Sequence, residues 1–547
     1  MYSRAALAAL SLICLPALAT AQVDSESMDD LNAWGEGFLS AQEQDFPITL
    51  WTGSDDQTLL SLMQQTGTRD LTLAERRLLR RVILSPTRKP SGPLAEDLLA
   101  ERARLMLDLG EADAAARLAP RLQGDDHGLD AETIAVDLDL ARGREASACT
   151  RLDGEVPQTE YWYKLRAVCA VLQENYAGAE LAVEFASSQG MDDPWFVEAI
   201  FAASGDSIDP PVARFDSGMN IALSAKANLD THGVELESSR PDLAAAAAAR
   251  PGVPDVLRAR LASLASQVDL VSPADHRDIL TAQLDEDGFT PTTAVEEALF
   301  VLEDPLAAPD EKLAQLASVL DNLAYGPMAA YASTADLFQT DLQRLLKGEG
   351  APAYGVTFAR AALAAGRSDL MQAWLTKAGS DAYYPPDPFQ VAMLEALDLI
   401  SGGEQSLASV AEVQTRLLES ISNDAEAALA ARVLALWTGF DIVLDADARY
   451  FMSVQAESGR SIEPYTLLAI RSAAQSGAFG EAALMMLKET EGHPQQLTSS
   501  DMATLIAILR DMGAEDIARQ FALETSEFWM LTTPPSELMP VEPVRLT

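Results

Sequence analysis

The sequence predicts an all-α protein, an α-solenoid of antiparallel helix pairs arranged in two lobes. Three observations predict this fold. A pattern of apolar helix, small or polar break and second helix recurs along the chain, helix start signals mark much of the remainder, and the alternating Val, Ile and Thr runs typical of strands are nearly missing. The best strand candidate is the short stretch from Phe46 to Trp51.

Composition bounds the class of protein and its partners. With 547 residues the chain exceeds the size at which one hydrophobic core keeps growing, so it must divide into domains or extend as a solenoid. Hydrophobic residues make up 48% and charged residues 22%, which indicates a packed core. The 83 acidic and 39 basic residues give a formal net charge of −44, which repels nucleic acid. The densest basic stretch, residues 76–89, is too short to reverse this, and we expect no nucleic-acid partner.

The first 21 residues predict a signal peptide. Arg4 supplies a positive charge, residues 5–18 form an apolar core, and Ala19-Thr20-Ala21 fits the small-x-small pattern that precedes cleavage. Cys14 lies inside this segment without the small-residue context of a lipoprotein site, so we expect no lipid anchor. Past residue 21 we find no uncharged apolar run of about 18 residues or more, the length that spans a bilayer. We therefore predict a periplasmic chain with no membrane insertion after signal cleavage.

Residues 22–95 follow as a predicted N-terminal helical segment. Within it, Thr72 and Glu75 have the spacing of a capping box, in which each side chain hydrogen-bonds the backbone N–H of the other residue. A helix is therefore expected to begin just after Thr72.

The repeating unit is defined by what stands between its two helices. Glycine can end a helix in the left-handed conformation, and an alanine five residues later lets the next helix approach closely. The breaks at Gly110, Gly143 and Glu174 are 33 and 31 residues apart, and those at Gly477 and Gly513 are 36 apart. The pairs of break and small residue are Gly110 with Ala115, Gly143 with Ala148, Glu174 with Ala179, Gly477 with Ala482 and Gly513 with Ala518, and a sixth break at Gly366 is followed by Met371.

These spacings lie around the period of about 34 residues of tetratricopeptide repeats, and the turn with glycine and then alanine five positions on resembles that family. The resemblance covers about residues 96–205 and 350–530 and implies stacked helix pairs. The whole chain also resembles uncharacterised exported helical-repeat proteins, which implies a fold and no activity.

The remaining boundaries come from composition. Residues 206–255, which contain two adjacent prolines and a run of alanines, are predicted to form an irregular connection between the repeats at 96–205 and a second helical repeat lobe at 256–531. Residues 532–547 are rich in proline and predict an extended tail. Helix starts in the second lobe are predicted at Ser272-Pro273 and at Thr293-x-x-Glu296.

Two cysteines remain after signal cleavage, Cys149 and Cys169, in a compartment that permits disulfides. They lie on consecutive predicted helices, residues 144–152 and 161–172, so a bond would join one repeat to the next. Closing a loop of about 20 residues would contribute about 3 kcal/mol. Two free buried thiols are the alternative.

The sequence predicts neither a metal site nor a cofactor. The four histidines, His127, His232, His276 and His493, form no ligand pattern with one another and are predicted to be surface or loop residues. The acidic run at residues 285–288 has its glycine fourth, whereas an EF-hand loop needs glycine sixth. Nucleophile elbows, phosphate-binding loops and dinucleotide fingerprints are missing from the sequence.

One stretch is similar to a lytic transglycosylase, a family in which Glu-Ser precedes Gly-Ala-x-Gly-Leu-Met-Gln. Here Glu457-Ser458 precedes residues 477–480, Gly-Ala-Phe-Gly. The resemblance implies that Glu457 would protonate a glycosidic oxygen from a partly dry cleft. Glu457 stands 20 residues before Gly477, further than that family's short spacing, and Glu481-Ala482 replaces the Leu-Met pair. We therefore predict that the protein is not an enzyme.

Stacked helix pairs present a long surface that such proteins use to hold other chains. The sequence thus predicts a periplasmic scaffold for protein–protein interactions in the cell envelope, with an envelope protein or peptide as its partner. Two alternatives stay open at this point: a peptidoglycan-acting lytic enzyme that uses Glu457, and a structural component of an envelope machine.

Overall fold

The computed structural model describes residues 33–122, 128–231, 234, 236, 240–284, 289–380, 385–402 and 406–530. These residues form 27 α-helices and no strand, which confirms the predicted all-α solenoid. The stretch from Phe46 to Trp51, the best strand candidate, consists of loop and turns. The predicted signal peptide and the proline-rich tail lie outside the described residues.

The first thirteen helices run from the N-terminal segment to the middle of the chain: α1 (Asp56–Gln65), α2 (Leu73–Leu84), α3 (Ala95–Asp108), α4 (Ala112–Leu118), α5 (Ala131–Ala141), α6 (Glu145–Thr150), α7 (Glu160–Leu172), α8 (Tyr176–Ser188), α9 (Pro194–Ser204), α10 (Gly218–Lys226), α11 (Pro241–Ala248), α12 (Asp255–Ser266) and α13 (Pro273–Leu284). The remaining helices complete the chain: α14 (Ala294–Glu303), α15 (Pro309–Leu323), α16 (Met328–Leu337), α17 (Gln339–Leu345), α18 (Gly355–Ala364), α19 (Ser368–Ala378), α20 (Pro388–Ser401), α21 (Leu407–Ser420), α22 (Asp424–Gly439), α23 (Ala446–Val454), α24 (Pro464–Gln475), α25 (Phe479–Thr490), α26 (Ser499–Asp511) and α27 (Glu515–Ser526).

The predicted breaks are all tight turns between paired helices. In each turn, the N–H of the residue after the break donates to a carbonyl five residues earlier, as Ala514 does to Leu509 at 2.9 Å. This is the Schellman arrangement, which needs a left-handed residue at the break. The break residues have positive φ: Gly110 +84°, Gly143 +74°, Glu174 +61°, Gly366 +65°, Gly477 +84° and Gly513 +78°. The residues five positions on are at most 1% exposed: Ala115, Ala148, Ala179, Met371, Ala482 and Ala518.

The start signals also act as predicted. Thr72 with Glu75 and Thr293 with Glu296 form complete capping boxes. Ser272 accepts a hydrogen bond from the Asp275 N–H at 3.1 Å at the start of α13. Local sequence therefore determines where many of these helices begin.

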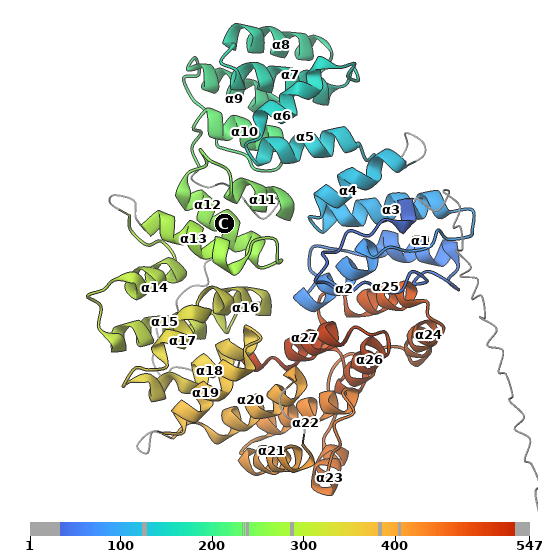
Figure 1. Cartoon of the computed structure of the whole chain (residues 1–547), viewed down its shortest axis with the longest axis vertical. Helices are drawn as coiled ribbons and strands as arrows, with labels where there is room; N and C mark the ends of the chain where they lie inside the picture. Colours follow the sequence, from blue (N-terminus) through green and yellow to red (C-terminus); the bar gives the residue numbers. More distant parts are fainter. Residues whose placement is uncertain are drawn as a thin grey trace, which may run out of the picture.

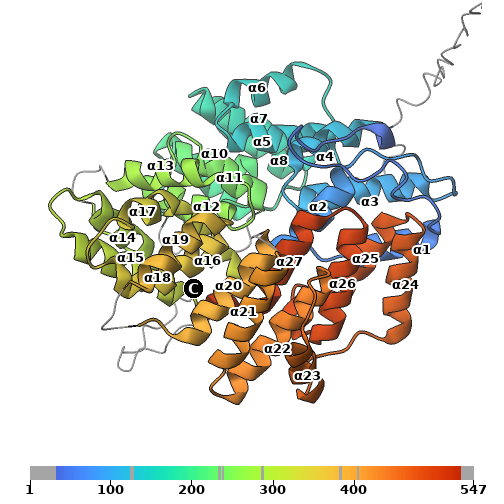
Figure 2. The same cartoon turned by 60° about the horizontal axis from the view of Figure 1, so that its bottom comes forward.

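The array curves back until its two ends meet. In Figure 1 the chain climbs from α3 to α8, descends through α10 to α19, and returns through α20 to α27 to reach α1 and α2. Helix α2 packs against α25 and α27, and α1 packs against α25; Figure 2 shows the same neighbours from another side. We call this contact between the N-terminal segment and α25–α27 the closure seam.

The closure seam is closely packed. A Cβ added at Gly480, the second residue of α25, would lie 2.1 Å from the ring of Trp51, so only glycine lets the indole lie on this helix. The Gly480 N–H donates to the Leu50 carbonyl at 2.9 Å, and Phe46 meets Phe479 edge to face at 6.0 Å. Local sequence patterns cannot place these contacts, because each joins two segments from opposite ends of the chain.

Buried carboxylates complete the closure seam. Glu524 of α27 accepts a hydrogen bond from the Ala74 N–H at 3.0 Å, and Glu75 accepts one from the Gly492 N–H at 3.2 Å. Ala74 stands in the first turn of α2, where N–H groups have no acceptor within their own helix. Helix α27, near the end of the described residues, thus caps α2, near their beginning.

Two large apolar cores divide the molecule. One runs from Ala33 to Leu118 and from Ala259 to Trp529, and the other, from Val136 to Ala262, fills α5 to α12. The described part of residues 206–255, predicted to be an irregular connection, contains the helices α10 and α11. Helix α10 packs on α5, and α11 packs on α5 and α12; Ile221 and Leu243 in these helices are fully buried.

Buried arginines hold helix ends together. Arg250 donates to the Leu140 carbonyl at the end of α5, and Arg102 donates to Ile83 and Ser85 at the end of α2 at 2.6 and 2.9 Å. Carbonyls at a helix end lack donors from their own helix and carry partial negative charge, so a guanidinium suits them. Several of the scarce cations therefore serve inside the fold. None of the described helices combines the length and apolar character needed to cross a membrane.

Candidate functional site

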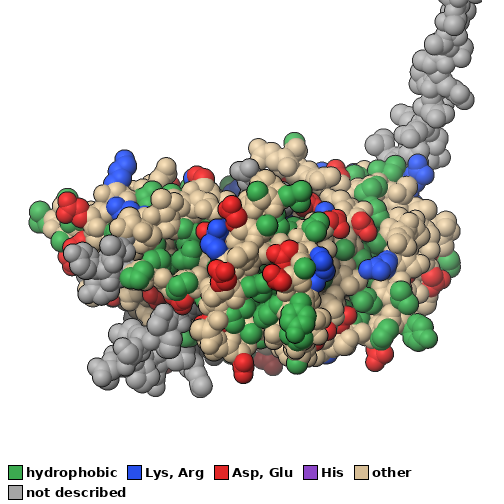
Figure 3. All heavy atoms as spheres, turned by 90° about the horizontal axis from the view of Figure 1, so that it is seen from below, with side chains coloured by type: hydrophobic (Ala, Val, Ile, Leu, Met, Phe, Trp, Pro, Cys, Tyr) green, Lys and Arg blue, Asp and Glu red, His purple; other side chains and the backbone are tan. Residues whose placement is uncertain are grey.

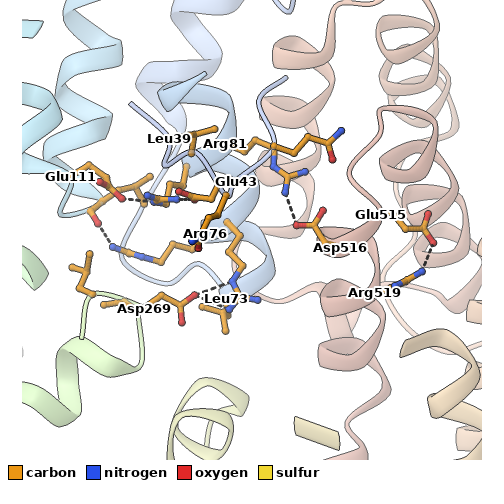
Figure 4. A pocket seen from close by; sticks show the side chains of 17 residues that line it. Leu39, Glu43, Leu73, Arg76, Arg81, Glu111, Asp269, Glu515, Asp516 and Arg519 are labelled. Carbon is orange, nitrogen blue, oxygen red and sulfur yellow. Dashed lines mark hydrogen bonds and ion pairs between the residues drawn. The ribbon is translucent and has the colours of Figure 1, made fainter. Parts of the chain in front are cut away.

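A cleft of about 860 Å³ lies where five separate parts of the chain converge. Helix α2 forms one wall, and the others are the stretch 39–44, the α3–α4 turn at 109–111, the α12–α13 turn at 268–270, and the first turns of α27. Figure 4 shows their side chains directed toward one another. We call this the central cleft. Its volume falls in the range of about 300–1,000 Å³ typical of ligand sites.

The wall formed by α2 is an arginine face. Arg76, Arg77, Arg80 and Arg81 all line the central cleft, because residues three and four apart share one side of a helix. The opposite side of α2 carries Leu78, Leu79, Val82 and Ile83, which are at most 3% exposed in the core. These arginines belong to the basic stretch at residues 76–89, which is too short to offset the acidic net charge. The spacing of these arginines along one helix face follows from the sequence, but the carboxylates that pair with them come from distant segments.

Carboxylates from other segments pair with three of these arginines. Arg80 pairs with Glu43 and Glu111, each from a different segment. Arg81 pairs with Asp516 of α27 at 2.5 Å, and Arg77 pairs with Asp269 at 2.8 Å. Each pair links α2 to another wall of the central cleft.

Arg76 is the exception. Its side chain is buried, with a residue exposure of 7%, and its Nη2 donates to the Leu109 carbonyl. No carboxylate of the described residues forms an ion pair with it. Burial lowers the pKa of Arg76, and Glu111 and Asp269 only partly offset this effect. The positive charge of Arg76 is therefore under-compensated.

Further donors at the central cleft have no acceptor among the described residues. Nη1 of Arg81 and Nε of Arg519 are both buried without a hydrogen-bond partner. Buried donors of this kind normally find partners, so each marks unused binding capacity. The charged residues among those that line the cleft are arginines, glutamates and aspartates.

Glu457 lies outside the central cleft. It is exposed, and its two carboxylate oxygens accept hydrogen bonds from the N–H and hydroxyl of Ser500 at 2.7 and 3.1 Å. Ser500 stands in the first turn of α26, so Glu457 caps that helix. Gly477 is a Schellman turn and Gly480 accommodates Trp51, so both glycines of the lytic-enzyme pattern have packing roles.

The structure also shows where the cysteines and two of the histidines discussed in the sequence analysis lie. Cys149 and Cys169 form a disulfide between α6 and α7, the first of the two alternatives for this pair. His493 lies in an exposed loop as expected, but His276 does not: it is only 4% exposed, against Ser263 at 3.0 Å. Burial lowers the pKa of His276 to about 4. His127, His232 and the acidic run at 285–288 lie outside the described residues.

Neither the acidic side chains nor the exposed apolar side chains of the described residues provide a second candidate site. Within the described ranges, no group of three or more His, Cys, Asp or Glu side chains could hold a metal ion. Hydrophobic side chains are exposed on the lower face of the molecule among scattered charges, as Figure 3 shows, and Tyr450 and Tyr465 on α23 and α24 are 71% and 87% exposed. Nothing in the structure indicates what covers them, so the central cleft remains the candidate site.

Comparison with protein-family descriptions, with curated proteins and with solved structures finds no match to this chain.

Proposed function

We propose that this protein is an exported interaction scaffold of the cell envelope, whose central cleft holds a segment of a partner protein or peptide. The single observation that carries the proposal is the central cleft itself: a ligand-sized space where five segments bring charged side chains together. Helical-repeat proteins commonly bind other chains along the surfaces that their curvature creates.

The residues at the central cleft suit recognition better than turnover. Its carboxylates are paired with arginines, as in the pairs of Arg81 with Asp516 and Arg77 with Asp269, and these two carboxylates are 63% and 49% exposed rather than enclosed in a dry site. Glu457, the acid of the alternative lytic reaction, is exposed and occupied at a helix start. Both observations favour the scaffold over the enzyme.

Site-specific photo-crosslinking tests the proposal. A photoreactive amino acid is placed at Gln44, an exposed residue at the central cleft, and in a matched variant at Gln189, an exposed residue after α8. Cells carrying each variant are irradiated, and crosslinked envelope proteins are identified. We expect a defined partner from Gln44 that Gln189 does not capture. The same products from both positions, or none from Gln44, would contradict a binding role for the cleft.

An assay on cell-wall sacculi tests the enzyme alternative directly. The purified mature protein is incubated with sacculi, and soluble muropeptides are measured. We expect none. Release that disappears in Glu457→Gln would overturn the scaffold proposal, and Glu463→Gln, a second change on the loop before α24, controls for the loss of one charge.

A further inference from the structure

The two most buried charged groups of the central cleft are cations: Arg76 is 7% exposed and the Arg81 side chain 11%. The carboxylates around them lie nearer to solvent, with side-chain exposures from 20% for Glu111 to 63% for Asp516, and Arg77 at the mouth of the cleft is 44% exposed. A ligand group that reaches the bottom of the cleft therefore meets arginine.

These deep arginines have hydrogen-bonding capacity left over. A guanidinium has five N–H donors. Arg102 of α3, which is fully buried, donates to four carbonyls, those of Ile83, Trp34, Glu36 and Ser85. Among the described residues, Arg76 donates only to the Leu109 carbonyl. Arg81 uses Nη2 on Asp516, and its Nη1 has no partner in the same ranges.

We propose that the central cleft binds a carboxylate of an extended peptide segment, received by the free donors of Arg76 and Arg81. This inference rests on the proposed binding function and specifies the chemistry of the ligand. A carboxylate is planar and matches the guanidinium fork with two parallel hydrogen bonds.

The electrostatics of the site support a singly charged anion. Burial of Arg76 outweighs the charges of Glu111 and Asp269, so an added anion would offset the desolvation that lowers its pKa. The net charge of −44 disfavours a polyanion such as nucleic acid. At physiological ionic strength that repulsion is screened beyond about 8 Å, whereas a buried pair is screened much less.

The lining also suits a peptide rather than a bare ion. Leu39, Leu73 and Leu270 line the central cleft beside the charged groups, so side chains next to the carboxylate would meet apolar surface. Two sources can supply the carboxylate: an Asp or Glu side chain, or the free end of a peptide chain.

Isothermal titration calorimetry on the whole mature protein distinguishes these sources. Four unlabelled probes are used: Ala-Ala-Glu-Glu-Ala-Ala with an amidated end, hexa-alanine with a free carboxylate, hexa-alanine amide, and Ala-Ala-Lys-Lys-Ala-Ala amide. We expect binding of the first, the second or both, and binding of the two others at least tenfold weaker. Equal binding of the neutral amide, preference for the lysine peptide, or no binding of either carboxylate peptide would overturn the inference.

Variants locate the binding. Arg81→Gln and Arg76→Lys, which keeps the charge but loses the fork, are each expected to weaken carboxylate binding at least tenfold. Arg88→Gln removes one charge at an exposed position away from the cleft and should leave the affinity unchanged. Circular dichroism checks that each variant is folded. Two cleft variants are used so that the test still holds if one of them does not fold. Folded Arg76→Lys and Arg81→Gln proteins with unchanged affinity would contradict the assignment.

The crosslinking and calorimetry results together test this inference separately from the proposed function. A partner crosslinked from Gln44 together with no binding of the carboxylate peptides would leave the scaffold role standing and remove only the ligand class. Absence of both would remove both.

Discussion

Helix α2 takes part in two contacts that differ in kind. At the closure seam, polar groups at its start are matched: the Ala74 N–H meets Glu524, Thr72 pairs with Glu75, and Glu75 also accepts from Gly492. At the central cleft, its arginine face is only partly matched, because Arg76 lacks a carboxylate partner among the described residues and Arg81 keeps a free donor. On one side, helix α2 joins the two ends of the curved helix array into a closed ring of helices. On its other side, the same helix leaves hydrogen-bond donors available.

This difference between the closure seam and the central cleft indicates that stability and binding depend on different parts of the molecule. Packing between buried side chains costs several kcal/mol to disturb, whereas half-exposed ion pairs contribute little. We therefore assign the stability of the closed ring to the closure seam and recognition to the central cleft. Variants of the two regions should affect different measurements.

The largest effect is expected from Trp51→Ala at the closure seam. Removing a buried tryptophan should lower the free energy of unfolding by about 3–5 kcal/mol, measured by urea denaturation. Gly480→Ala should also destabilise, by about 1–3 kcal/mol, because the added methyl group overlaps the indole. In the Trp51→Ala background the same change removes a helical glycine without a clash and should be neutral or stabilising. Additive losses would contradict this packing of Trp51 on Gly480.

A comparison of two buried arginines, Arg102 and Arg76, should give the next largest effect. Arg102→Met leaves four carbonyls without their hydrogen-bond donor and should lower the free energy of unfolding by about 3 kcal/mol or more. Arg76→Met leaves the Leu109 carbonyl without its donor and should lower it by about 1 kcal/mol. Thermal or urea unfolding measures both. Equal losses would mean that Arg76 contributes to the fold as much as Arg102 does, and would weaken the case for free donors in the central cleft.

Glu524 gives the closure seam a pH dependence. Burial raises the pKa of Glu524 from 4.5 to about 7, so between these values the folded chain keeps a proton that the unfolded chain has lost. Stability from this group is therefore present at low pH, falls as pH rises through that window, and is lost above about pH 7. Glu524→Gln should stabilise by about 2–3 kcal/mol at pH 8 and have little effect at pH 4.

The difference between wild type and Glu524→Gln isolates this residue, since Asp137 and Asp336, whose pKa values burial raises to about 6, are common to both. Urea midpoints measured from pH 4 to 8 provide the test. A difference that does not change with pH would contradict the assignment.

The smallest effect on stability is expected at the mouth of the central cleft. Arg77 and Asp269 are 44% and 49% exposed, so Arg77→Gln or Asp269→Asn should change the free energy of unfolding by at most about 1 kcal/mol, and less at high salt. A loss of several kcal/mol would show that the cleft, and not only the closure seam, holds the ring together.

Sequence predicted what depends on neighbours along the chain. The turns at Gly110 and Gly513 and the capping box at Thr72 follow from residues within about six positions. The closure seam was not predicted, because Ala74 and Glu524 are 450 residues apart. The central cleft was missed for the same reason: its basic stretch was noted, but the carboxylates that pair with it come from distant segments. His276 was predicted wrongly because its burial depends on packing against α12, where Ser263 lies.

Hydrogen exchange at three amides tests the closed ring most directly. Ala74 and Gly480 stand in the first turns of α2 and α25, where no acceptor exists within the helix, and Gly492 lies in a loop. Their acceptors are Glu524, the Leu50 carbonyl and Glu75, all across the closure seam. We predict exchange slowed by roughly two orders of magnitude or more at all three amides. Exchange at the rates of free loop amides would show that the ends of the array do not meet.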